Sequence, residues 1–84
     1  MIRGRKSIKN AATDAWMIEY GSLEGPGYPV WKLYDIPEIM STASRIMDAT
    51  RKEFVKKSKS SELPQVSYML QANDEGVYIE YEIR

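Results

Sequence analysis

Acidic side chains near the end of the chain are the first residues whose type and spacing could support chemistry. Glu80 and Glu82 are two residues apart, which places them on one face of a strand predicted over 77–83. Glu19, on another predicted strand, is placed on the same face. Paired carboxylates can act as general acid and base or bind Mg²⁺ or Ca²⁺. Nothing in the sequence marks a desolvating pocket around them, so we interpret them as solvated or as an acidic binding surface.

Two turn segments have compositions that ligand-binding loops also use. Residues 21–27 contain three glycines and a proline, but no Gly-Lys-Ser/Thr follows as a phosphate-binding loop requires. Residues 73–76 (Asn-Asp-Glu-Gly) lack the twelve-residue ligand spacing of a calcium loop. We interpret both as hairpin turns, and the first, which leads to Tyr28, also as a contact loop.

The composition excludes several kinds of site. The 84 residues include no cysteine and no histidine. The chain therefore has no disulfide, thiolate zinc site or Ser-His-Asp triad, and it lacks the side chain that titrates near neutral pH. We predict no catalytic residue, no metal and no cofactor, and that the protein is not an enzyme.

Charge is balanced in total but alternates in blocks along the chain. Twelve basic residues oppose twelve acidic ones, which argues against uniform attraction to nucleic acid. Two basic blocks nevertheless suggest an alternative function, a nucleic-acid-binding accessory protein that neutralises phosphates. Its candidate residues come from an N-terminal arm and from a helix end: Arg3, Arg5, Lys6, Lys52, Lys56 and Lys57.

Periodicity and turn residues predict the elements that position these side chains. Alternating residues indicate strands over 15–20, 30–34, 66–72 and 77–83, and helical spacing indicates a helix over 36–57 that Asp35 caps. The prediction is an α+β fold with the order ββαββ, in which one long helix packs on one face of a mainly antiparallel four-stranded sheet. Residues 1–12 are predicted as a flexible basic arm, and 13–84 as a single domain.

Aromatic residues and methionines are numerous enough for a core and an interface. We assign Trp16, Phe54, Tyr68 and Tyr81 to the core, and expect Trp31, Tyr28, Tyr34 and Tyr78 to be partly exposed. The apolar stripe of the helix is longer than such a sheet covers, which makes a homodimer one of the open alternatives. The residues predicted to bind a protein partner are Glu19, Tyr28, Trp31, Tyr78, Glu80 and Glu82.

These observations favour a small protein-interaction module over a nucleic-acid binder or an enzyme. No motif carries a resemblance to a known family, and no run of residues is apolar and long enough for a membrane span or a signal peptide. We predict a cytoplasmic regulator or inhibitor of a larger macromolecular machine. The most concrete form of this hypothesis is a phage or mobile-element protein that blocks a host enzyme or defence complex.

Overall fold

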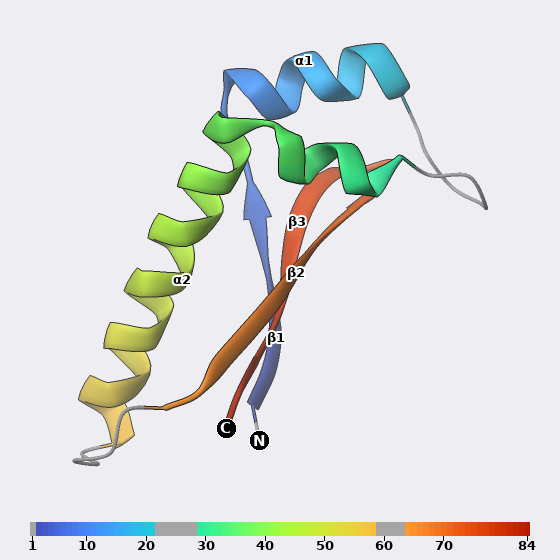
Figure 1. Cartoon of the computed structure of the whole chain (residues 1–84). Helices are drawn as coiled ribbons and strands as arrows, with labels where there is room; N and C mark the ends of the chain where they lie inside the picture. Colours follow the sequence, from blue (N-terminus) through green and yellow to red (C-terminus); the bar gives the residue numbers. More distant parts are fainter. Residues whose placement is uncertain (1, 22–28, 59–63) are drawn as a thin grey trace.

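The computed structural model describes residues 2–21, 29–58 and 64–84 of the chain (Figure 1). The elements follow in the order β1 (Ile2–Ile8), α1 (Ala11–Tyr20), η1 (a 3₁₀ helix, Val30–Asp35), α2 (Pro37–Ser58), β2 (Val66–Asn73) and β3 (Gly76–Ile83). The fold is α+β, as predicted.

The strands form one three-stranded antiparallel sheet in the order β1-β3-β2. In this register Arg5 lies opposite Glu80, and Glu80 lies opposite Met69 on the other side of β3. The predicted four strands and the order ββαββ are not confirmed, because the sheet's third strand comes from the N-terminus and two predicted strands are helical.

Residues 2–8 form strand β1, so the prediction of a flexible basic arm over 1–12 is wrong for this segment. Every residue of β1 is paired with a residue of β3, from Ile2 with Ile83 to Ile8 with Val77. Ile8 is 2% exposed and belongs to the core. The sequence does not indicate this strand because its apolar content is low. Its stability depends on pairing with β3, at the other end of the chain.

Residues 15–20, predicted as a strand, belong to helix α1. Asn10 caps this helix, since its side chain accepts a hydrogen bond from the Thr13 backbone N–H while the Thr13 hydroxyl accepts one from the Asn10 N–H. Gly21 ends the helix with a φ of 63°, a conformation that glycine adopts readily. The alternation of Trp16 and Ile18 was misleading: Trp16 is 3% exposed and Ile18 86%.

The second predicted strand, residues 30–34, is also helical, and it forms η1. The predicted long helix is confirmed as α2, with Pro37 at its first position, where the missing N–H of proline costs nothing. Asp35 does not cap α2, because it lies in η1 and Ile36 directly precedes the helix. The β2–β3 hairpin is also as predicted, and Gly76 closes it with a positive φ of 136°.

The core lies between one face of the sheet and the helices. Ile39, Ala43 and Met47 of α2 are buried against Leu70 and Ile79 of the sheet. Figure 1 shows α2 descending along the sheet and α1 crossing its upper end. Trp16 is buried as predicted and Phe54 and Tyr81 are partly buried, whereas the prediction for Tyr68 is wrong because it is 37% exposed.

Candidate functional site

The face of the sheet opposite α2 is the strongest candidate for a functional surface. Because strand side chains alternate, the buried Ile79 and Val77 of β3 place their neighbours on this other side. We call the surface the open face, and in sheet order it comprises Arg3, Arg5 and Ser7 of β1, Tyr78, Glu80 and Glu82 of β3, and Ser67, Met69 and Gln71 of β2.

Two ion pairs join β1 to β3 across the open face. Arg3 Nε lies 3.1 Å from Glu82 Oε1, and Arg5 Nη2 lies 3.1 Å from Glu80 Oε1. Arg5 also lies over the ring of Tyr78, with 5.1 Å from Cζ to the ring centroid. The carboxylates that looked like an acidic surface, and the arginines that looked like an arm, therefore form one surface whose charges are mutually neutralised. Pairs this exposed contribute about 0–1 kcal/mol each to stability.

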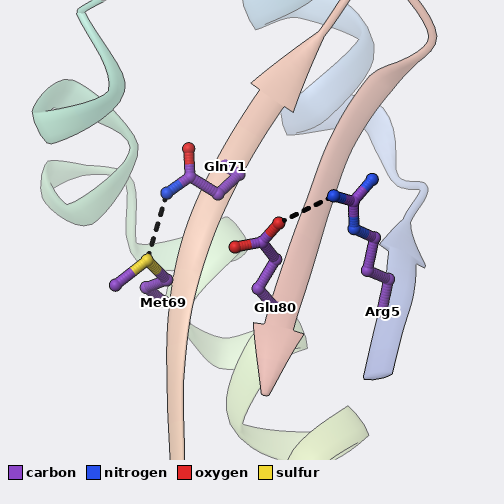
Figure 2. Close-up of polar contacts among 4 residues, drawn as sticks. All are labelled: Arg5, Met69, Gln71 and Glu80. Carbon is purple, nitrogen blue, oxygen red and sulfur yellow. Dashed lines mark hydrogen bonds and ion pairs between the residues drawn. The ribbon is translucent and has the colours of Figure 1, made fainter. Parts of the chain in front are cut away.

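The third row of the open face carries no charge. Met69 is 49% exposed, and its Sδ accepts a hydrogen bond of 3.1 Å from Gln71 Nε2. Figure 2 shows this contact beside the Arg5–Glu80 ion pair on the neighbouring strands. A cavity of about 570 Å³ has the two arginines, Met69 and the two glutamates of this face in its lining, together with Ser67, Gly4, Tyr68 and Tyr81. A ligand here would meet positive, negative and uncharged groups in three adjacent rows.

The predicted partner-binding residues are only partly brought together. Tyr78, Glu80 and Glu82 share the open face, as the alternation of β3 indicates. Glu19 lies exposed on α1 and Trp31 lies on η1, 65% exposed, so neither belongs to this face. Tyr28 lies outside the described residues.

Trp31 instead belongs to a small aromatic group between α1 and η1. Lys32 Nζ donates a 3.0 Å hydrogen bond to Tyr20 Oη and lies 5.6 Å from the Trp31 ring centroid. That hydrogen bond is the main reason why the pKa of Lys32 is raised above its ordinary value. Tyr20 also packs on Trp16, with ring centroids 4.8 Å apart, so the group anchors η1 to α1.

The predicted nucleic-acid-binding residues fall in three separate places. Arg3 and Arg5 are ion-paired on the open face. Lys6 has the opposite parity on β1 and lies on the helix side of the sheet, where its charge acts on Glu53.

The three lysines of the α2 end do not form one cluster either. Lys57 Nζ lies 3.2 Å from Glu53 Oε1, and this hydrogen bond, with smaller effects from the Lys57 and Lys6 charges, lowers the pKa of Glu53. Lys56 comes nine residues after the buried Met47, about two and a half helical turns, and so points away from the sheet. Lys52, one turn earlier, is on the same outer side.

Sequence reasoning missed that Arg3 and Arg5 belong to the open face. A usable signal was present, because Arg3 and Arg5 have the same two-residue spacing as Glu80 and Glu82. In an antiparallel pair of strands, two residues with this spacing can each lie opposite a residue of opposite charge. Ser67, Met69 and Gln71 could have been added from the alternation of β2.

Other kinds of site find no support in the described part of the chain. No three residues among its Asp and Glu side chains are grouped closely enough to hold a metal ion. Within the same residues, no helix combines the length and the apolar character needed to cross a membrane. Neither a protein-family model, nor a curated protein, nor a solved structure matches this chain.

Proposed function

We propose that this protein acts by binding another protein through the open face, as a regulator or inhibitor of a larger macromolecular machine. The observation that carries the proposal is the uncovered sheet face with three ordered rows, arginine, glutamate and uncharged. Among the residues that the structure describes, the helices pack at the other face or across the end of the sheet.

The chemistry of the open face favours a protein partner over a polyanion. Protein interfaces combine paired charges with exposed methionine and aromatic side chains. Met69 lies opposite Glu80 and Tyr78 lies under Arg5, so both flank the Arg5–Glu80 ion pair. Half-exposed charges of opposite sign at fixed spacing give specificity for a partner with the complementary pattern more than they give affinity.

Nucleic-acid binding has weaker support. Arg3, Arg5 and Lys57 each have a carboxylate within 3.2 Å, so binding phosphate would require breaking an ion pair. Lys52 and Lys56 are exposed on the outer side of α2, but two neighbouring lysines release few counterions. A phage or mobile-element origin, with a host enzyme or defence complex as target, remains the concrete version of the proposed inhibitor.

The test is a charge swap that keeps each ion pair but reverses its direction. Arg5→Glu combined with Glu80→Arg preserves one positive and one negative group across β1 and β3, and so the fold, while inverting the pattern that a partner meets. Affinity capture from a lysate of the native host, with mass identification, should yield a partner with the natural chain and lose it with the swapped chain.

A matched swap on α2 provides the control. Glu53→Lys combined with Lys57→Glu inverts an ion pair of nearly the same length, 3.2 Å against 3.1 Å, outside the open face. Capture should be unchanged by this second swap. Equal capture by all three chains, or loss on the α2 swap alone, would contradict binding through the open face.

A further inference from the structure

The two outer strands of the sheet offer very different edges to another strand. The β1 edge carries Arg3, Arg5 and Lys6, and charged edge strands resist pairing with other chains. Strand β2 is the other edge, and its eight residues, Val66–Asn73, include no charged side chain. Its exposed Tyr68 and Met69 lie in the half that precedes Leu70.

Two backbone hydrogen bonds fix which groups of β2 point outward. The Arg84 N–H donates to the Gln65 carbonyl, so Gln65 faces β3, whereas the Leu70 N–H donates away from β3 to Tyr34 Oη at 2.9 Å. Alternation along the strand then directs the N–H and C=O of Val66 and Tyr68 outward as well. This short run of outward groups has the spacing of an antiparallel ladder.

Among the described residues, this run of outward groups is limited at both ends. Pro64 has no N–H to donate, and the Leu70 N–H is already donated to Tyr34. The midpoint between these two positions is Ser67. An antiparallel pairing of β2 with its own copy around Ser67 therefore places Pro64 opposite the partner's Leu70, so that the two positions that cannot bond face each other.

We propose that two copies of this chain associate through β2, with a two-fold axis at Ser67, to form a continuous six-stranded sheet. In this register Val66 pairs with the partner's Tyr68, and both backbone bonds of each such pair form. Ser67 lies opposite the partner's Ser67, with no charge brought against a like charge along the strand. The symmetry is isologous, which is the commonest arrangement of homodimers.

This dimer leaves the open face accessible and joins the two faces edge to edge. It extends the proposed function without depending on it, because the partner strand meets the β2 edge and not the rows of Arg5 and Glu80. Tyr34 keeps its hydrogen bond to Leu70 in both copies.

The first test measures molecular mass by sedimentation across a concentration series. The natural chain should approach twice its 9.7 kDa as concentration rises. Ser67→Lys places two lysines face to face at the axis and should hold the mass at one chain, since like charges directly opposite destabilise strand pairing. Ser7→Lys is the matched control: the same change at an exposed serine of the open face, on β1, should leave association unchanged.

The second test remains informative if a lysine at either position disturbs folding. The natural chain has no cysteine, so Ser67→Cys and Ser7→Cys each introduce one thiol. Facing residues that do not exchange backbone bonds have Cα atoms about 4.5 Å apart, within disulfide reach. Under oxidised glutathione, Ser67→Cys should give covalent dimers much faster than Ser7→Cys. A monomer at every concentration, a dimer unaffected by Ser67→Lys, or equal cross-linking of the two cysteine variants would each overturn the proposal.

Discussion

The two edges of the sheet are built by opposite means. Strand β1 is charged and fully paired with β3, and its arginines are held by Glu82 and Glu80. Strand β2 is uncharged, and a tyrosine hydroxyl from η1 occupies one of its outward N–H groups. Charge and coverage are alternative ways to protect a strand edge. The difference shows that a basic N-terminal segment can be an edge strand, and it is the reason why we propose association through the edge without charges.

The largest expected effect tests whether β1 is an integral part of the core. Ile8 is 2% exposed and Ile2 is 47% exposed, although both lie on the helix side of the same strand. Ile8→Ala should lower the free energy of unfolding by about 2–5 kcal/mol, because it leaves a cavity under the helices. Ile2→Ala is the matched control. It should lower the free energy of unfolding, measured by urea denaturation, by well below half as much. Equal, small losses at both positions would mean that β1 is peripheral after all.

A close contact inside the sheet gives the second prediction. The ring of Tyr81 crosses β1 at Gly4, so a Cβ added at Gly4 would lie 3.0 Å from Tyr81 Cε1 and closer still to its Cζ and hydroxyl oxygen. Gly4→Ala should therefore cost about 1–3 kcal/mol of unfolding free energy by overpacking. Tyr81→Leu removes the far end of the ring. In a chain that carries Tyr81→Leu, the added Gly4→Ala change should therefore cost less unfolding free energy than it does in the natural chain. A fully additive pair of losses would show that the ring and the glycine are independent.

How far the sequence predicted the fold depends on whether the signals were local. The hairpin between β2 and β3 and the long helix α2 could be read from turn residues and periodicity within one segment. Strand β1 could not, because its prediction requires matching Arg3 and Arg5 with Glu80 and Glu82 at the other end of the chain. Helix α1 could have been recognised from Asn10 and Thr13, but the short apolar run that follows fits either a strand or a helix.

The candidate site was predicted in the same partial way. Tyr78, Glu80 and Glu82 were placed together correctly, since alternation along one strand is sufficient. Their neutralisation by Arg3 and Arg5 required the strand order, which no local pattern contains. Glu19 and Trp31 were included because residues 15–20 and 30–34 were predicted as strands, whereas both segments are helical.

A smaller effect is expected where η1 covers the β2 edge. Tyr34→Phe removes the hydroxyl that accepts from the Leu70 N–H, and a hydrogen bond of this kind contributes about 0.5–1.5 kcal/mol. Amide exchange should accelerate at Leu70 and remain unchanged at Ile79 on the central strand. Tyr68→Phe removes a hydroxyl from the same edge and, as the control, should leave the Leu70 amide protected. If Tyr34→Phe did not change amide exchange at Leu70, η1 would not protect this edge. The contrast between an edge protected by charge and an edge protected by coverage would then fail.

The smallest effect tests whether a charge on β1 affects a side chain on the helix side of the sheet as well as those on the open face. The pKa of Glu53 is lowered first by its hydrogen bond from Lys57, then by the Lys57 charge, and then by Lys6 on β1. Lys57→Ala should therefore raise the pKa of Glu53 the most, and Lys6→Ala should raise it less, in an NMR titration of the Glu53 carboxyl. Lys9→Ala removes a charge just beyond β1 and should not change it.

The same titration fixes the sign of a pH effect on stability. Because the folded chain holds the pKa of Glu53 below its ordinary value, this carboxylate favours the folded state at neutral pH. That contribution disappears as the pH falls from the ordinary carboxyl pKa through the lowered one. Lys57→Ala should make it smaller, and the acid-side loss of stability should shrink accordingly. An unchanged Glu53 pKa in Lys6→Ala would show that the charges of β1 have electrostatic effects only on the open face. Their role would then be limited to the ion pairs with Glu80 and Glu82.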